Sequence, residues 1–215
     1  MNELLIKVGI AYLLGSVVGS LLIGRLRGGV DIRRLGSGNA GGTNALRTQG
    51  RAFAFWVLLI DVGKGWIATR WLGAVPLPGI APAPELRAWL PAFCGVAAIV
   101  GHVYPLWYGF RGGKGVATLV GAVLGINFWL FVGMLLMWLV AVSLSGFVGL
   151  GSMTAAVMLP VLVLLMGAEP RAPLLAFGAA MAVIIVFTHR SNIARMRART
   201  EPRARRLWLL GHGRT

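Results

Sequence analysis

The chain has 215 residues, of which 57% are hydrophobic and only 13% are charged. Soluble domains carry about 25% charged residues, so this composition excludes an ordinary soluble or disordered protein and predicts a membrane protein. Its 21 Lys and Arg against 6 Asp and Glu give a net charge of +15, but they interrupt apolar runs, which argues against a nucleic-acid partner. The single cysteine, Cys94, excludes an intrachain disulfide.

Long apolar segments divide the chain. The first is as long as a full membrane span and lacks a basic leader, so we expect a retained helix and not a cleavable signal. The length suits one membrane-embedded domain over residues 1–215, with a basic tail from about 190. The apolar segments lie at about 3–24, 52–72, 88–107, 116–142, 150–166 and 172–188.

Charge decides whether the segment 116–142 crosses the membrane once or twice. Arginines cluster in residues 25–51 and in the tail 190–215, and both regions should face the cytoplasm because basic residues mark the inner side. An even number of spans must separate them, so 116–142 is expected to form two short helices that turn near Gly125-Ile126-Asn127. The sequence therefore predicts an all-α polytopic integral membrane bundle of about seven helices, two of them short, with the N-terminus outside and the C-terminus inside. The Pro-rich stretch 76–84 is expected to be an outer loop.

The first polar motif is a glycine-rich loop after the first helix. It reads Gly36-Ser37-Gly38-Asn39-Ala40-Gly41-Gly42-Thr43-Asn44 and is followed by Arg47. Glycines allow close backbone approach, successive N–H groups bind anions, and Arg47 offers a planar fork for a phosphate. The GxGxxG spacing does not indicate a dinucleotide site, because a membrane helix and not a strand precedes it. A flexible basic loop on lipid headgroups is the alternative, but it would not need these small polar side chains.

The second polar motif combines Gly101-His102-Val103-Tyr104-Pro105 with Arg111-Gly112-Gly113-Lys114-Gly115. Lys114 stands where a helix begins, and the free N–H groups and dipole of a helix N-terminus favour anions. The motif is similar to a Walker A loop, but Gly115 replaces the Ser or Thr that would bind Mg²⁺, which argues against an NTPase. His102 is either an interfacial hydrogen-bonding residue or a catalytic one.

The third polar motif, His189-Arg190-Ser191-Asn192, lies where the last apolar helix ends. His189 and Asn192 are three residues apart and would share a helix face. A helix cap followed by a basic tail on anionic lipid is the alternative, and it accounts for the arginines at 203–206.

Charged and polar residues inside the apolar segments have structural interpretations. Asp61 and Lys64 are three residues apart in the second segment, and a mutual ion pair facing the bundle is the least costly arrangement. Ser145, Ser152 and Thr154 are of a type that joins membrane helices, so their inner location alone makes them candidates for a site.

Together the three motifs resemble the bacterial acyl-phosphate:glycerol-3-phosphate acyltransferases, the PlsY family of integral membrane enzymes. The resemblance covers nearly the whole chain, with GSGNAGGTN, GHVYPLWYGFRGGKGVAT and HRSNIARMRARTEPR in the family's order. The chain departs from the family pattern at Gly42, where Ala is usual, and at Arg199, where Gly is usual. In SGFVGLGS, Gly149 replaces a serine, whereas Ser152 still matches.

The resemblance implies a reaction at the bacterial plasma or inner membrane, the first acylation of phospholipid biosynthesis. The 1-hydroxyl of sn-glycerol 3-phosphate attacks an acyl phosphate, giving 1-acylglycerol 3-phosphate (lysophosphatidate) and inorganic phosphate. The donor would be acyl phosphate, not acyl-CoA or acyl-carrier protein. The resemblance also implies catalytic roles for Ser37, His189 and Asn192. It implies substrate binding by Gly36, Gly38, Asn39, Thr43, Asn44, Arg47, Gly112, Gly113, Lys114 and Ser152.

We expect the three motifs to meet beneath the inner leaflet and bind two doubly anionic headgroups. The first loop would hold the acyl phosphate and polarise its carbonyl, and Arg47, Lys114 and Asn192 would hold glycerol 3-phosphate. Either His189 or the substrate's own phosphate would take the proton.

Two other functions are compatible with a basic, glycine-rich membrane protein. An organic-phosphate transporter would place its site near the midplane, often between internal repeats, and the sequence has neither feature. A non-catalytic lipid-binding scaffold would not need Lys114 or His189. The scattered positions of His102, His189 and His212 predict no metal site, and no cofactor or obligatory protein partner is inferred.

Overall fold

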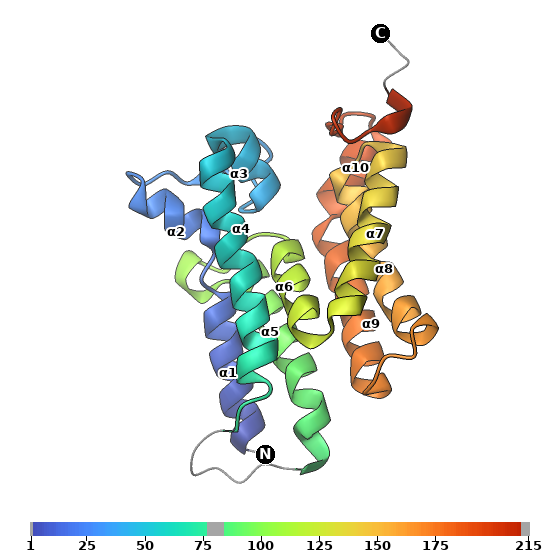
Figure 1. Cartoon of the computed structure of the whole chain (residues 1–215). Helices are drawn as coiled ribbons and strands as arrows, with labels where there is room; N and C mark the ends of the chain where they lie inside the picture. The colour runs from blue at the N-terminus through green and yellow to red at the C-terminus, as the bar shows by residue number, and fades with distance from the viewer. Residues whose placement is uncertain (1, 77–83, 212–215) are drawn as a thin grey trace. The chain divides into compact units, whose positions relative to one another are not determined.

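The computed structural model describes residues 2–76 and 84–211, and these residues contain helices and no strand (Figure 1). The all-α prediction is therefore confirmed. The chain divides into two compact units, unit 1 (Met1–Asn127) and unit 2 (Phe128–Thr215). Most of the predicted 76–84 loop and His212 lie outside the described residues.

Unit 1 consists of membrane-length helices and short helical turns. Its α-helices are α1 (Asn2–Gly15), α2 (Gly19–Leu26), α3 (Gly42–Gln49), α4 (Arg51–Trp66), α5 (Leu90–Val103) and α6 (Val116–Ile126). Its short turns are η1 (Ile32–Arg34), η2 (Ile67–Leu72, a π-helical continuation of α4), η3 (Pro84–Trp89) and η4 (Leu106–Tyr108).

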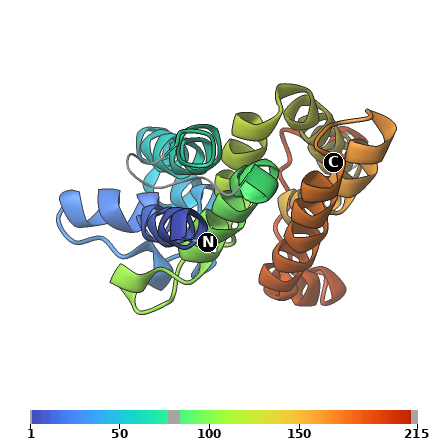
Figure 2. The same ribbon diagram turned by 90° about the horizontal axis from the view of Figure 1, so that it is seen from below.

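Glycines bring the helices of unit 1 into close contact, since small residues let membrane helices approach each other. α1 packs along α5, and α4 packs along α6 (Figure 2). A Cβ added at Gly65 would collide with the backbone of Thr118, and one added at Gly121 would collide with that of Val62. Residues further along α4 contact residues further along α6. The two helices therefore run parallel. Both therefore begin at the end of the unit that carries the glycine-rich loops.

The first apolar segment was expected to be one helix over 3–24, and this expectation is wrong. α1 ends at Gly15, α2 begins at Gly19, and the two helices are bent by 49°. The groups that stabilise the break belong to α4, so no local signal in the first segment predicts it.

The break is stabilised by the ion pair predicted on α4. Lys64 Nζ lies 2.9 Å from Asp61 Oδ1 and donates to the carbonyls of Gly15 (2.9 Å) and Val17 (2.7 Å). Asp61 Oδ1 accepts from the N–H of Gly19 at 3.0 Å. A cation thus faces the C-terminal end of α1 and an anion faces the N-terminus of α2, which matches both helix dipoles. The predicted pair is confirmed, and it compensates the backbone groups that the break exposes.

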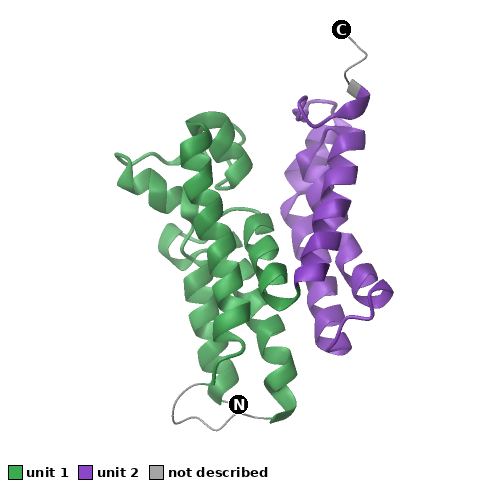
Figure 3. Cartoon of the chain, in the orientation of Figure 1, with its two compact units in different colours: residues 1–127 green, residues 128–215 purple. Residues whose placement is uncertain are grey.

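The described part of unit 2 is a helical bundle (Figure 3) followed by a basic C-terminal segment. Its helices are α7 (Phe128–Ser145), α8 (Val148–Leu165), α9 (Arg171–Thr188), α10 (Arg190–Arg197) and the short turn η5 (Leu209–Gly211). The segment 116–142 is broken at Asn127, as predicted from charge. However, α7 is not short, because it continues to Ser145 and reaches 18 residues.

The long helices have the length and composition of membrane spans. Within the part of the chain that the structure describes, five helices qualify singly, and the bent pair α1–α2 adds a sixth; α6, with 11 residues, is shorter than a full span. The apolar segments expected from the sequence are thus all helical. The single spans are Arg51–Leu72, Pro84–Tyr108, Phe128–Ser145, Val148–Leu165 and Arg171–Thr188.

Candidate active site

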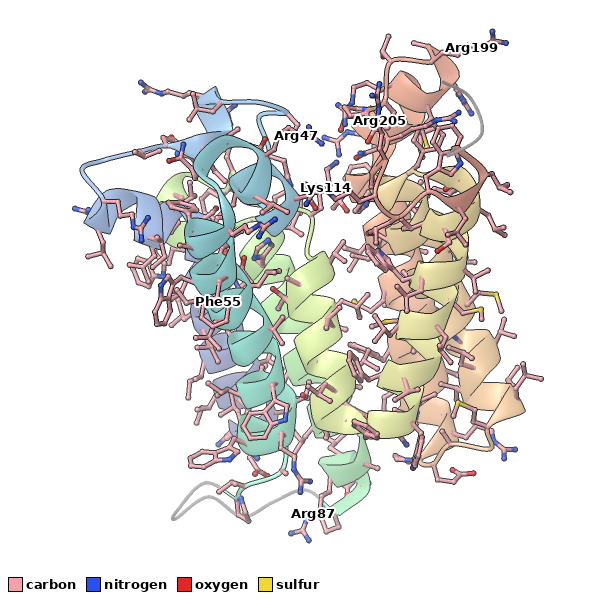
Figure 4. The ribbon with its side chains drawn as sticks, turned by 45° about the horizontal axis from the view of Figure 1, so that its top comes forward. Arg47, Phe55, Arg87, Lys114, Arg199 and Arg205 are labelled. Carbon is pink, nitrogen blue, oxygen red and sulfur yellow. The ribbon has the colours of Figure 1, made fainter. Side chains whose placement is uncertain are left out.

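The two glycine-rich loops lie at the same end of unit 1. Figure 4 shows Arg47 and Lys114 at this end and Arg87 at the opposite end. The first loop connects η1 to α3, and the second connects α5 to α6. The side chains of Ser37, Thr43 and Arg47 are exposed, and Lys114 is half-buried. Thr43 and Arg47 are four residues apart on α3, so they share one face of that helix.

Asn44 organises the first loop from within. Its side chain is buried, its Oδ1 accepts from the N–H of Ser37 at 3.0 Å, and its Nδ2 donates to the carbonyls of Ile32, Leu35 and Asn39, each at 3.0 Å. Gly36 has φ +55°, and a Cβ there would collide with Asn44 Oδ1. The glycine therefore permits the contact that fixes the backbone at Ser37.

Asn44→Asp should destabilise the protein although the two side chains have the same shape. A carboxylate keeps the acceptor for Ser37 but loses the amide donors and faces three carbonyl oxygens. We expect the free energy of unfolding to fall by about 2 kcal/mol or more, the cost of leaving buried polar groups unsatisfied, together with loss of activity. The measurement is thermal unfolding in detergent, with Gln49→Ala at the end of α3 as the control. Equal melting temperatures for the two variants would contradict this role.

The second loop folds back onto the end of α5. The N–H of Gly112 donates to the carbonyl of Val103 at 3.0 Å, and that of Gly113 donates to the carbonyl of His102 at 3.1 Å. A Cβ at Gly113 would collide with His102 Nε2 and lie 3.1 Å from the carbonyl oxygen of Ala40. Because Ala40 belongs to the first loop, Gly113 is a point at which the two glycine-rich loops meet.

Arg33 joins the two loops a second time. Its Nη1 donates to the carbonyls of Tyr108 (3.1 Å) and Arg111 (2.9 Å) in the second loop, and its Nε and Nη2 donate to the carboxylate of Asp31. The hydrogen bonds from the Arg33 side chain hold the pKa of Asp31 below its usual value, so the carboxylate stays ionised at neutral pH. The link between the loops is thus electrostatic as well as steric.

The third motif lies in unit 2, around the junction of α9 and α10. His189 is buried, and its Nδ1 lies 2.8 Å from the carbonyl of Ile185. A carbonyl can only accept, so Nδ1 carries a hydrogen. Asn192 is also buried, and its Nδ2 donates to Glu201 Oε1 at 2.6 Å. Glu201 Oε2 accepts from Arg195 Nε at 2.6 Å, so one carboxylate orients both side chains.

The start of α8 packs against the same asparagine. A Cβ at Gly149 would lie 2.9 Å from Asn192 Nδ2, closer than side chains normally approach. Ser152, one turn further along α8, is buried and donates to the carbonyl of Val148 at 3.0 Å. Serine in place of Gly149 would therefore require Asn192 to move.

Arg199 forms the end of α10 in a conformation that suits glycine. Its φ is +57°. Its N–H donates to the carbonyl of Met196, and the N–H of Thr200 donates to that of Arg195. These two bonds define a Schellman motif, in which glycine usually occupies the left-handed position.

Arg199→Gly should therefore stabilise unit 2. The left-handed conformation costs a non-glycine residue about 1–2 kcal/mol, so we expect the melting temperature to rise. Ala194→Gly, at an exposed position inside α10, should instead destabilise by about 1 kcal/mol. Thermal unfolding of both variants measures these opposite changes in melting temperature. A lower melting temperature for Arg199→Gly would show that the arginine side chain contributes more than the strain costs.

The structure brings together the first two predicted motifs, within unit 1, and it describes the third separately in unit 2. Two residues that organise the candidate site, Arg33 and Glu201, were not predicted from the sequence. Glu201 is an acid inside a strongly basic tail, and this contrast was the available signal; nothing local distinguished Arg33. Within the described residues, no three His, Cys, Asp or Glu side chains gather where they could hold a metal ion.

A family model for glycerol-3-phosphate acyltransferase matches residues 5–199. The chain belongs to this family. Among curated members, the glycerol-3-phosphate acyltransferase of Synechococcus sp. (strain CC9902) is 39% identical over 93% of this chain and 94% of its own length. That of Chlorobaculum tepidum is 38% identical over 94% of this chain and 97% of its own length.

Solved structures of the family share the fold. The crystal structure of PlsY (YgiH), an integral membrane glycerol 3-phosphate acyltransferase, in its glycerol 3-phosphate form has a TM-score of 0.79 at 31% identity, covering 93% of this chain and 94% of that one. Its lysophosphatidic acid form has a TM-score of 0.78 at 30% identity, covering 95% and 97%. This chain is accordingly an integral membrane protein of the PlsY type.

Proposed function

We propose that this protein transfers a fatty acyl group from acyl phosphate to the 1-hydroxyl of sn-glycerol 3-phosphate, in the first acylation of phospholipid biosynthesis. The hydroxyl oxygen bonds to the acyl carbon, the bond from that carbon to the phosphate oxygen breaks, and the phosphate leaves with the electron pair. The products are 1-acylglycerol 3-phosphate and inorganic phosphate. An acyl phosphate is an activated mixed anhydride, so the reaction calls for charge stabilisation and positioning and needs no cofactor.

The meeting of the two glycine-rich loops is the observation that carries this proposal. Both substrates bring a phosphate whose charge approaches −2 at neutral pH, by analogy with phosphate esters. Arg47 and Lys114 supply cations at one end of unit 1 (Figure 4). The loops supply backbone N–H groups other than those of Ser37, Gly38, Gly112 and Gly113, which donate to oxygens within the protein. We assign Ser37 and the first loop to the acyl phosphate, whose carbonyl the loop polarises as an oxyanion hole.

The acceptor is assigned to Arg47, Lys114 and Asn192. The proton of the attacking hydroxyl goes either to Nε2 of His189 or to the acceptor's own phosphate. Asn39, Thr43 and Ser152 are assigned neutral hydrogen bonds to the substrates, and Asn44 acts through the loop it organises.

We also propose an orientation in the membrane. The N-terminus would lie outside, and the glycine-rich loops and the basic tail would face the cytoplasm, where glycerol 3-phosphate is dissolved. The arginines that flank the first loop and fill the tail support this orientation through the positive-inside rule. The acyl chain of the donor would remain in the bilayer while its phosphate reaches the inner boundary.

Purified protein in lipid nanodiscs, given palmitoyl phosphate and radiolabelled glycerol 3-phosphate, tests the proposal. We expect labelled lysophosphatidate and inorganic phosphate in equal amounts, and no product with palmitoyl-CoA or palmitoyl-acyl-carrier protein. Formation of lysophosphatidate with palmitoyl-CoA or palmitoyl-acyl-carrier protein as the sole donor would overturn the choice of acyl phosphate. Accumulation of unmodified glycerol 3-phosphate inside sealed vesicles would identify a transporter instead.

A further inference from the structure

A buried polar cluster lies beneath the second glycine-rich loop. It consists of Asp61 and Lys64 on α4 and His102 on α5, with exposed fractions of 0%, 3% and 2%. Burying ionisable groups at membrane depth costs free energy, so such groups usually have a function. The ion pair compensates the break between α1 and α2, but this does not account for the histidine.

The cluster fixes the protonation of His102. Its Nδ1 lies 2.8 Å from Lys64 Nζ and 3.4 Å from Asp61 Oδ1. A lysine ammonium can only donate, so the shorter contact requires Nδ1 to accept. A second positive charge on the ring would face the ammonium directly. His102 is therefore neutral, with its hydrogen on Nε2.

The Nε2 edge of His102 supports the second loop. A Cβ at Gly113 would collide with Nε2, so the ring lies directly against this glycine. The carbonyl of His102 accepts from the N–H of Gly113 at 3.1 Å, and the carbonyl of Val103 accepts from that of Gly112 at 3.0 Å. Lys114, the proposed phosphate-binding cation, is the next residue in the chain.

We propose that Asp61 and Lys64 are positioning residues that act through His102. Lys64 holds the imidazole as the neutral Nε2–H tautomer, Asp61 keeps Lys64 charged and in place, and the ring sets the position of Gly113 and thereby of Lys114. The effect on catalysis rests on the proposed function, whereas the effect on the tautomer does not.

The tautomer is tested by NMR of ¹⁵N-histidine-labelled protein in nanodiscs. In the wild type we expect a histidine with unprotonated Nδ1 that does not titrate between pH 5 and 8, assigned by its loss in His102→Gln. In Asp61→Asn/Lys64→Met, which removes both charges together, this signal should shift toward protonated Nδ1. An unchanged spectrum in the double variant would overturn the proposal.

The catalytic effect is tested by comparing two buried ion pairs. Glu3 and Lys7 on α1 form a pair 2.9 Å apart with similarly low exposure, and they do not belong to the loops. Asp61→Asn/Lys64→Met should lower kcat/KM by about tenfold to a hundredfold, as small misplacements of catalytic groups do. Glu3→Gln/Lys7→Met should stay within about twofold, on the same scale. Equal losses of kcat/KM per folded molecule in the two double variants would overturn the proposal, because they would mean that both buried pairs act only on stability.

Two further comparisons keep the outcome decisive. If the Asp61/Lys64 double variant does not fold, His102→Gln with the pair intact should show the loss in kcat/KM at a nearly unchanged melting temperature; unchanged kcat/KM would overturn the proposal. If the wild type transfers no acyl group from acyl phosphate, the proposed function fails. The histidine spectra and calorimetric binding of glycerol 3-phosphate then decide the positioning role alone.

Discussion

Lys114→Ala is expected to lower kcat/KM by about 10²–10³-fold, the range seen when one preorganised group is removed from a developing charge. Lys114 precedes α6, whose N-terminus has free N–H groups and a positive dipole end. Removing the ammonium leaves the doubly charged phosphate of the acceptor with Arg47 and backbone N–H groups as its donors in unit 1. Steady-state kinetics with acyl phosphate and glycerol 3-phosphate measure the loss.

Arg111→Ala is the matched control for charge. Arg111 is exposed in the same loop, and its backbone carbonyl, not its side chain, accepts from Arg33. We expect its kcat/KM to stay near the wild-type value, and Lys114→Arg to recover part of the activity because the charge is kept. Similar losses for Lys114→Ala and Arg111→Ala would mean that the loop attracts anions only through its net charge.

The second large effect is expected for Gly113→Ala, which adds a single methyl group. That methyl would collide with His102 Nε2 and lie 3.1 Å from the Ala40 carbonyl. Neither neighbour is the end of a flexible side chain, so the backbone of the second loop has to move away from the first. A displacement of about 1 Å can cost about a hundredfold in rate, and we expect at least this loss in kcat/KM.

Gly63→Ala is the control for the general effect of replacing a glycine by alanine. Gly63 lies on α4 between Asp61 and Lys64, and a Cβ there would meet nothing within 4 Å. Activity and melting temperature should be retained or slightly raised, since alanine favours helices over glycine. Full activity of Gly113→Ala would show that the two loops need not touch at this point.

The positions of the long helices could be predicted because membrane spans depend on a local property, the length of an apolar run. Charge favoured two helices in the segment 116–142, and the structure has a break at Asn127, within the expected turn Gly125-Ile126-Asn127. The break after Gly15 could not be predicted, because Lys64 and Asp61 satisfy its backbone groups from a helix almost 50 residues further along the chain. The length of α7 was underestimated because the apolar run was taken to end at Val142, whereas the helix continues to Ser145 and ends before Gly146, whose φ is +78°.

For the candidate site, the sequence identified residue types but not which of them contact each other. The first two motifs meet through Gly113 and Arg33, and such contacts depend on how α4, α5 and α6 pack. Asn44 was expected to bind substrate, and in the structure its amide holds the loop backbone. Buried asparagines with either role look alike in a sequence.

The break between α1 and α2 has a consequence for biogenesis. Each lone charge on α4 costs about 2.5–3.5 kcal/mol to insert at the middle of a membrane helix, and α4 carries two. Their partners are the carbonyls of Gly15 and Val17 and the N–H of Gly19, all of which emerge from the ribosome earlier. Stable entry of α4 into the lipid should therefore require α1 and α2 to be retained at the translocon, so that α1 and α4 are released into the bilayer as a pair.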